Sequence, residues 1–326
     1  MDVTARPPDG RPPAEVLAFD PASATVVREP PGTGYGFWAG GHKVSWDADS
    51  ATFVLFYRLR SPVEQGRGGV ARVAVGTDGV HFDDVWEVTK AQLVANSIEV
   101  GHCVRHDAGE WRLYLSYEFA GGPIPFWRVD VLRGDSPGSL DTQGRRTVLM
   151  PYDYGLRTLK DPWAVRTPEG GYRVYAVSEA HARPQVDGAV TRARPLDATV
   201  LAESDDGLVF PTVRRVYEPP GDGSWHGNRG RVNCLFRYGE GWAGTFDGGR
   251  TNYDNFEEWC GLVHSPDGLR IEREETDGPW VRSPHGCVRY VWGLRVRQRL
   301  LWYFEHTRED GSHDLRVAEV DLPEGL

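Results

Sequence analysis

The sequence lacks several features that would assign it to a common class. Its four cysteines contain no Cys-x-x-Cys pair, which argues against structural zinc and favours free, buried thiols. No apolar run approaches the ~20 residues of a membrane span, and none near the start has signal-peptide length. No long Lys/Arg block offsets the formal net charge of −10, which argues against nucleic acid or an anionic membrane as a partner. We therefore expect a soluble, cytoplasmic protein that is a monomer or a weak homo-oligomer.

Glycine and aromatic residues are abundant, with 39 Gly and 12 Trp, as suits turn-rich sheets. An apolar strand, a polar turn and a second apolar strand recur five times along the chain. The expected last apolar residues of the five first strands lie 60, 61, 70 and 53 residues apart, at Val44, Val104, Val165, Leu235 and Val288. A repeat of this length built from hairpins is typical of a radial β architecture.

Three intervals between these positions carry a second hairpin pattern, at residues 77–82, 205–210 and 266–269. Each contains Asp-Gly between apolar residues, which supplies the positive φ that a tight turn requires. Each unit is therefore expected to hold four strands. The sequence predicts an all-β fold, a five-bladed β-propeller with four antiparallel strands per blade.

The two ends of the chain complete this prediction. Residues 1–13 contain two Pro-Pro pairs and are expected to be flexible, with residues 14–326 forming a single propeller domain. The last unit has room for only three strands. An N-terminal strand, from residues 15–19 or 24–28, is expected to complete the last blade and close the ring, which removes exposed sheet edges.

Innermost strands of a propeller run side by side around its axis, so residues at equal offsets from the repeat positions gather at one end of the central channel. Polar residues at these offsets are His42, Lys43, Glu99, Asp161, Arg231, Asn233 and His285. Trp38 and Trp163 lie beside them in the sequence and suit either sugar stacking or packing inside a blade.

Four segments carry a resemblance to a known superfamily: Lys160-Asp161-Pro162, Ser97-Ile98-Glu99, the aromatic strand at residues 111–117 and the turn at residues 204–207. With them, residues 30–320 resemble the five-bladed β-propeller glycosidases, which include glycoside hydrolase families 43, 32, 68, 117 and 130. The resemblance implies a glycoside hydrolase that acts on a small sugar or a glycosylated metabolite through carboxylate acid/base catalysis. It implies no required cofactor and leaves room for an axial calcium ion.

In the resembled families three acidic residues from separate blades share the catalysis. Asp161 matches the carboxylate that supports the transition state or tunes a pKa, and Glu99 and Glu179 are the available partners. The sequence departs from the pattern in blade one, where Gly41-His42-Lys43 stands in place of the base carboxylate. His42 can act as an acid or base near neutral pH, and Lys43 can hold an anionic group of a substrate.

Other interpretations remain open from the sequence alone. Asp161 could accept backbone N–H groups at a strand entrance, Glu99 could pair with Arg231 or Lys160, and His42 could be a core histidine. Glu179 could be salt-bridged beside His181. The departure in blade one also suits a propeller that has lost hydrolysis and binds a small molecule, or that catalyses a lyase, isomerase or cyclisation step. An interaction scaffold is a third interpretation, and a hard cation at Asn252, Asp254 and Asn255 fits their oxygen ligands.

Overall fold

The protein is almost entirely β-structure. The computed structural model describes residues 14–106, 109–122, 125–180, 196–251 and 256–323. Three sheets each contain four consecutive antiparallel strands. The first contains β6 (Ala95–Arg105), β7 (Trp111–Phe119), β8 (Phe126–Gly134) and β9 (Arg146–Leu149). The second contains β10 (Lys160–Arg166), β11 (Tyr172–Ala180), β12 (Leu196–Ser204) and β13 (Val213–Tyr217). The third contains β14 (Arg231–Tyr238), β15 (Gly241–Gly248), β16 (Trp259–Ser265) and β17 (Glu272–Arg273).

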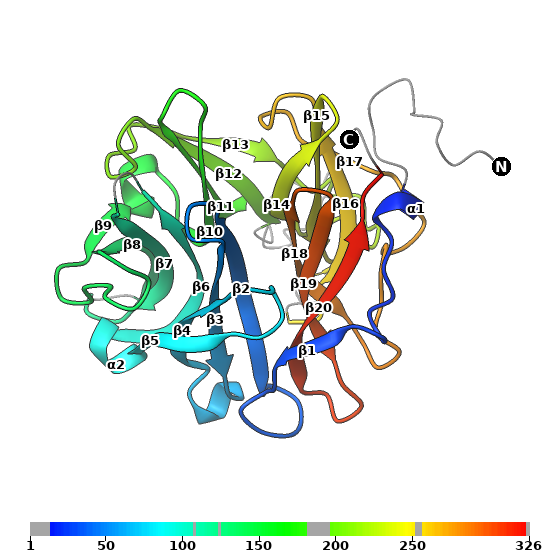
Figure 1. The fold of residues 1–326 in the computed structure, drawn as a ribbon, viewed down its shortest axis with the longest axis horizontal. Coiled ribbons are helices and arrows are strands. Elements are labelled where there is room, and N and C mark those ends of the chain that lie inside the picture. Colours follow the sequence, from blue (N-terminus) through cyan, green and yellow to red (C-terminus); the bar gives the residue numbers. More distant parts are fainter. Residues whose placement is uncertain (1–13, 107–108, 123–124, 181–195, 252–255, 324–326) are drawn as a thin grey trace, which may run out of the picture.

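The fourth sheet has eight strands and joins the two ends of the chain. It contains β1 (Thr25–Arg28), β2 (Trp38–Asp47), β3 (Thr52–Arg60), β4 (Gly68–Gly76), β5 (Asp83–Thr89), β18 (Val288–Val296), β19 (Arg299–Thr307) and β20 (His313–Asp321). Short helices lie at α1 (Ala14–Leu17), α2 (Lys90–Leu93), η1 (Val63–Gln65) and η2 (Pro151–Tyr154). Figure 1 shows the strand groups arranged around a common centre.

The eight-stranded sheet is mixed, because β2 and β20 meet through one parallel pair, Trp38 with His313. This pair joins the group β18–β20 to the group β2–β5 in one sheet, so the described residues form four sheets. The count of five blades therefore stays a prediction. An N-terminal strand does join the C-terminal strands: β1 pairs antiparallel with β20, as the sequence predicted for residues 24–28. The other predicted N-terminal strand, at residues 15–19, was wrong. Its first residues form α1, and the predicted flexible segment 1–13 lies outside the described residues.

The three predicted Asp-Gly turns are confirmed. Each joins the third and fourth strands of its group, and the glycines Gly79, Gly207 and Gly268 have φ values of +82°, +70° and +77°. In every case a tyrosine from a neighbouring strand group donates a hydrogen bond to the carbonyl oxygen of the turn glycine: Tyr303 to Gly79, Tyr114 to Gly207 and Tyr175 to Gly268. The turns therefore fix adjacent sheets to one another as well as reversing the chain.

We call the first strand of each group, β2, β6, β10, β14 and β18, an inner strand. β2 lies against β6 and β18, β6 also against β10, and β14 against β18. Every inner strand has an irregularity in its pairing with the second strand, at residues 40–43, 98–101, 160–163, 232–234 and 289–292. Such β-bulges redirect side chains, and they often lie next to functional sites.

The sequence placed one repeat position wrongly. Val288 was expected to end the first strand of the last unit, whereas it begins β18. The hairpin between β18 and β19 turns at Arg297 and Gln298, where Arg297 has a φ of +60°. Glycine or asparagine usually occupies a turn position with this conformation, but here it is an arginine. The sequence therefore contains no residue pattern that identifies the turn.

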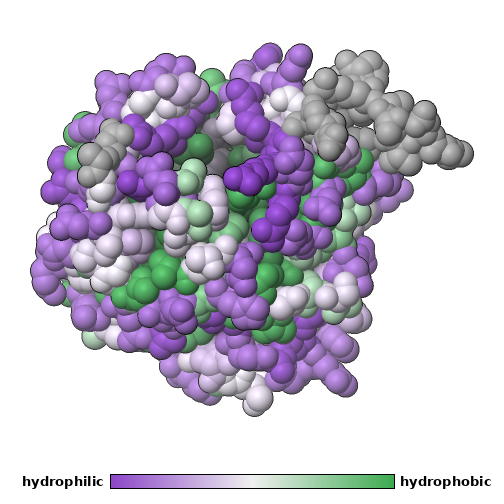
Figure 2. Space-filling model, viewed as in Figure 1, coloured by the Kyte–Doolittle hydropathy of each residue, from purple (hydrophilic) through white to green (hydrophobic). Residues whose placement is uncertain are grey.

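The core lies between adjacent sheets, so strands that are buried on both faces have continuous apolar runs rather than alternation. In β3, residues 53–57 are all buried. Hydrophilic side chains cover most of the face shown in Figure 2, and hydrophobic ones show between them. Among the described residues, no helix is long and apolar enough to cross a membrane.

Candidate active site

The bulges of the inner strands bring polar residues together around the centre of the fold. Gly41, Glu99, Asp161 and Tyr290 each follow the last regular pair before the bulge. Three of these residues have positive φ: +56° for Gly41, +54° for Asp161 and +53° for Tyr290. A non-glycine residue with this backbone is uncommon, and its side chain is aimed away from the regular alternation of a strand.

Asp161 is buried and bound to a cation from the next sheet. Its Oδ2 accepts from Nη1 of Arg231 at 3.1 Å, and its backbone N–H donates to Oγ of Ser116 at 3.0 Å. Oδ1 of Asp161 has no hydrogen-bond partner among the described residues. The carboxylate thus keeps one acceptor position open, which a substrate hydroxyl can fill.

Arg231 contacts several acidic side chains around Asp161. Its Nη2 lies 2.7 Å from Asp247 and 3.5 Å from Glu258, and its Nη1 donates to the Tyr290 hydroxyl at 3.0 Å. Burial raises the pKa of Asp247, with Arg231 opposing the shift and Glu258 adding to it. Burial also works against ionisation of Glu258, but Arg231 and Arg289 outweigh it and hold the pKa of Glu258 well below its usual range. One guanidinium therefore organises three carboxylates.

Glu99 forms a second buried cluster. It is paired with Arg58 from β3, its Oε1 lies 3.6 Å from Arg67, and the same oxygen accepts from Oγ of Ser97 at 3.0 Å. Burial pushes the pKa of Glu99 upward, but Arg58, Lys160 and Arg67 outweigh it and lower the pKa below the usual glutamate range. Glu99 is therefore an ionised carboxylate at neutral pH. It can serve as a base, a nucleophile or a hydrogen-bond acceptor.

The third cluster connects the last strands to β2. Arg289 contacts Glu258 at 2.6 Å and Glu305 at 2.8 Å, and Glu305 accepts the backbone N–H of Gly41 at 2.7 Å. A Cβ atom on Gly40 would lie 2.1 Å from Oε1 of Glu305. Glycine at position 40 therefore lets the Glu305 carboxylate reach the backbone of β2.

Lys43 is nearly fully buried. Its Nζ donates to the backbone oxygen of Asn233 at 2.8 Å and lies 4.4 Å from the centre of the Trp292 ring. Burial lowers the pKa of Lys43 to about 7, although Asp161 acts in the opposite direction. A lysine in this range exists in both protonation states near neutral pH, so Lys43 can transfer a proton.

His42 has no exposed surface, and its ring nitrogens face the backbone of Tyr303 and Tyr290 without a hydrogen bond of regular geometry. Burial lowers the pKa of His42 to about 4, so its imidazole is neutral at pH 7. Asn233 is also buried, and both polar atoms of its side chain lack described partners.

The structure places the other predicted site residues less centrally. Glu179 lies near the end of β11 with its side chain 30% exposed, 3.9 Å from Arg157, and its predicted neighbour His181 lies outside the described residues. His285 is exposed and precedes β18, because the repeat position used to place it was displaced. Trp163 stacks on Tyr175 with ring centres 3.9 Å apart, which is packing within a sheet.

Trp38 is buried and contacts charged side chains. The guanidinium carbon of Arg60 lies 4.4 Å from its ring centre and that of Arg289 lies 4.6 Å away. Arg60 is also 4.2 Å from the centre of the Phe256 ring. Arg60 forms no ion pair with a carboxylate among the described residues, and burial lowers its pKa to about 10, with Glu99 opposing the shift. This aromatic and cationic group lies next to the Arg289 cluster.

Sequence reasoning missed the partners that hold the site together. They are Arg58, Asp247, Glu258, Arg289, Tyr290 and Glu305. Two of them, Asp247 and Glu305, come directly after the apolar runs that end at Phe246 and Phe304, as Arg58 comes after Tyr57. A charged residue at the same end of three second strands was a usable signal, because those ends adjoin the inner-strand bulges.

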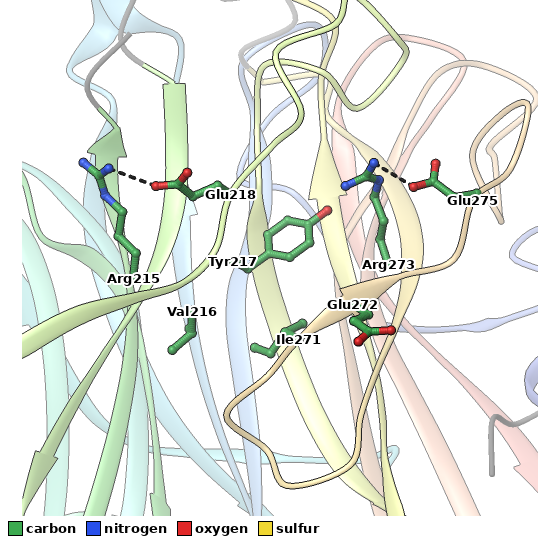
Figure 3. Close-up of a pocket in the computed structure, with 8 residues that line it drawn as sticks. All are labelled: Arg215, Val216, Tyr217, Glu218, Ile271, Glu272, Arg273 and Glu275. Atoms are coloured by element: carbon green, nitrogen blue, oxygen red, sulfur yellow. Dashed lines mark hydrogen bonds and ion pairs between the residues drawn. The ribbon is translucent and has the colours of Figure 1, made fainter. Parts of the chain in front are cut away.

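Two cavities also lie on the outer strands. The cavity in Figure 3, about 550 Å³, lies between β13 and β17 and is lined by the pairs Arg215–Glu218 and Arg273–Glu275. A second, about 950 Å³, lies along the turns at residues 166–173 and 203–212. None of the predicted site residues lines either cavity. The candidate active site is therefore the central cluster of charged residues.

No family model and no curated protein sequence matches the chain. Among solved structures, a thermostable family-43 glycoside hydrolase superposes with a TM-score of 0.65 at 10% identity, covering 93% of this chain and 94% of the other. The fold is that of the β-propeller glycosidases.

Two further structures extend this comparison. The GH43_1 enzyme from Xanthomonas citri, solved with xylose, has a TM-score of 0.62 at 11% identity and covers 90% of each chain. The β-1,2-mannobiose phosphorylase from Listeria innocua, solved with β-1,2-mannobiose, has a TM-score of 0.60 at 14% identity and covers 90% of this chain and 93% of its own. The predicted resemblance to a β-propeller glycosidase superfamily is confirmed at the level of the fold.

Proposed function

We propose that the protein is a glycoside-processing enzyme with a five-bladed propeller and a catalytic site at its centre. Support for five blades comes from the single parallel pair between Trp38 and His313, which is a narrow contact between two strand groups. Each group then begins at an inner strand that carries a bulge. The substrate is a small sugar or a glycosylated metabolite, in line with the sugars bound by the structural neighbours.

The observation that carries the proposal is the shared position of Glu99 and Asp161. Both follow the last regular pair before the bulge of adjacent inner strands, both are buried, and both are held by arginines from other strands. In this proposal Glu99 is the ionised carboxylate that activates water or attacks the anomeric carbon. Asp161 stabilises the positive charge that develops on the sugar.

The remaining predicted residues fill supporting roles. Glu179 is a candidate general acid, because its partly exposed side chain lies at the strand end nearest Asp161. Lys43 is the second candidate, since its pKa near 7 allows it to donate a proton. Arg231 and Asn233 hold substrate hydroxyls in this proposal. His42 and the exposed His285 are weaker candidates for the roles predicted from the sequence.

The test is a panel of aryl glycosides and small disaccharides, each assayed with and without inorganic phosphate. We expect Glu99→Gln and Asp161→Asn each to lose about 10²–10⁴-fold in kcat/KM. The matched control is Glu203→Gln, which removes a carboxylate of β12 that pairs with Arg173 of β11 and Arg214 of β13. Turnover that survives in both central variants would exclude the proposed pair.

A second candidate function follows from the position of Gly41. A glycine occupies the bulge position in β2 where the resembled families carry a catalytic carboxylate, and every described central carboxylate is already bound to an arginine. This arrangement suits a protein that binds a sugar, or catalyses a non-hydrolytic step, without hydrolysing it. Sugar binding measured by calorimetry, with no turnover on the panel, would favour this second candidate.

A further inference from the structure

Three potential metal ligands from distant parts of the sequence meet beside the Arg289 cluster. They are Glu257, which lies just before β16, Cys287, which directly precedes β18, and His313, which begins β20. Their ligand atoms all lie within 4.8 Å of one another. Among the described residues, this is the single group of three or more His, Cys, Asp or Glu side chains close enough to share one ion.

His313 is oriented by a carboxylate on each side. Its Nδ1 lies 3.3 Å from Oε2 of Glu305, and its Nε2 lies 3.5 Å from Oε1 of Glu257. The ring is also stacked against Trp38, with centres 4.8 Å apart. Nε2 also lies 3.1 Å from Oγ1 of Thr307, and that hydroxyl lies 3.4 Å from Sγ of Cys287.

The donor set suits a metal ion. When Nδ1–H pairs with Glu305, Nε2 keeps its lone pair beside Glu257 and the Thr307 hydroxyl. A carboxylate on the other ring nitrogen of a ligating histidine is common around zinc. A thiolate, an imidazole and a carboxylate together suit zinc rather than calcium or magnesium. With zinc–ligand bonds of about 2.0–2.3 Å, tetrahedral ligands lie roughly 3.3–3.8 Å apart. Nε2 of His313 and Oε1 of Glu257 already lie in this range at 3.5 Å. Since all three ligand atoms lie within 4.8 Å of one another, no pair needs to close by more than about 1 Å.

We propose that Glu257, Cys287 and His313 bind one Zn²⁺ ion, with water as the fourth ligand. Cys287 and His313 are buried, whereas the side chain of Glu257 is 34% exposed, so solvent reaches the site from that side. Three protein ligands and one open position are the arrangement of a zinc ion that can bind water or substrate. The absence of a Cys-x-x-Cys pair does not argue against this zinc site, because its ligands are spread over 57 positions of the sequence.

The proposed zinc site adjoins the candidate active site through Glu305. Glu305, which contacts His313, also binds Arg289 and the backbone of Gly41. The zinc site nevertheless stands on its own ligands. It is tested without any assay of sugar turnover, so its failure and the failure of the proposed enzyme are separate results.

The experiment measures metal binding directly on the full chain. Protein treated with a chelator is titrated with Zn²⁺ by calorimetry and with Co²⁺ by absorption spectroscopy, which detects a cobalt–thiolate charge-transfer band. We expect one ion per chain and a cobalt–thiolate band in the wild type. Glu257→Gln, at a partly exposed position that is expected to tolerate the change, should weaken Zn²⁺ binding at least about tenfold.

Cysteine variants give the matched comparison. Cys287→Ser should abolish the cobalt–thiolate band, whereas Cys103→Ser should keep it, and both thiols are equally buried at 1% exposure. No ion bound by the folded wild type would overturn the proposal. Equal Zn²⁺ binding by Cys287→Ser, or Ca²⁺ binding as tight as that of Zn²⁺, would also overturn it.

Discussion

At the scale of single residues, Lys43 is a lysine buried in the interior of the protein. It is one of only three lysines in the chain, and its ammonium lies in the interior against Trp292 and the backbone of Asn233. Burial disfavours the charged form and lowers its pKa to about 7, against about 10.4 for an unfolded lysine. Between these values the unfolded chain holds a proton that the native protein lacks, so rising pH stabilises the fold.

Lys43→Met should remove this dependence. We expect the free energy of unfolding of the variant, minus that of the wild type, to be highest at pH 6 and to fall as the pH rises to 9. The slope should be at most about 1.4 kcal/mol per pH unit. Urea unfolding at several pH values measures it, with Lys90→Met in the surface helix α2 as the control. A difference that is constant with pH would mean that Lys43 is solvated in the native state.

The two central carboxylates could be found from the sequence, but their partners could not. Glu99 and Asp161 lie in short segments with recognisable neighbours, and the repeat brings them to one end of the fold. Their cations come from elsewhere. Glu99 pairs with Arg58 of β3 and not with Arg231 or Lys160, and Arg231 binds Asp161 instead. The choice among arginines depends on side-chain directions at the bulges, which sequence spacing does not determine.

At the scale of elements, the bulge in β2 depends on Gly41. This residue has a φ of +56°, and a Cβ atom there would lie 2.7 Å from Nε of Arg58, the side chain that pairs with Glu99. A side chain at position 41 therefore strains the backbone and displaces the cation that keeps Glu99 ionised. Both effects act on the candidate active site.

Gly41→Ala should lower the free energy of unfolding by about 1–3 kcal/mol. Gly34→Ala separates the two causes, because Gly34 has a φ of +94° but no atom within 4 Å of an added Cβ. The backbone strain is then present without the contact to Arg58. We expect the loss at position 41 to exceed that at position 34 in chemical unfolding. Equal losses would show that Arg58 moves aside at no cost.

The hairpin turns show why part of the fold was predictable. Asp-Gly at residues 78–79, 206–207 and 267–268 combines an aspartate that accepts backbone N–H bonds with a glycine of positive φ. Two adjacent residues are therefore enough to predict each of these turns. The turn at Arg297 and Gln298 is set by the pairing of β18 and β19 and contains neither residue type. The local sequence therefore does not predict this turn. The repeat position in the last unit was misplaced as a result, and His285 was misplaced with it.

At the scale of the whole molecule, the N-terminal segment joins the last strand group to the first. β1 pairs with β20, and the ring of Phe19 lies 5.4 Å from that of Trp280 and 5.0 Å from that of Phe304. Arg28 donates to the backbone oxygen of Phe82, near the start of β5. Removal of this segment would uncover the edge of β20, and an uncovered edge strand is a template for association.

Deletion of residues 1–28 should therefore lower the free energy of unfolding by about 3 kcal/mol or more, since burial of Leu17 and Val27 contributes roughly 1.5–3 kcal/mol each. We also expect the shortened chain to self-associate. Thermal unfolding and light scattering after size-exclusion chromatography measure the two effects. Deletion of residues 1–13 is the control, because it leaves α1 and β1 intact. If both deletions leave the stability and the mass unchanged, the strand groups are held together by the inter-sheet contacts alone and β1 is dispensable for closure.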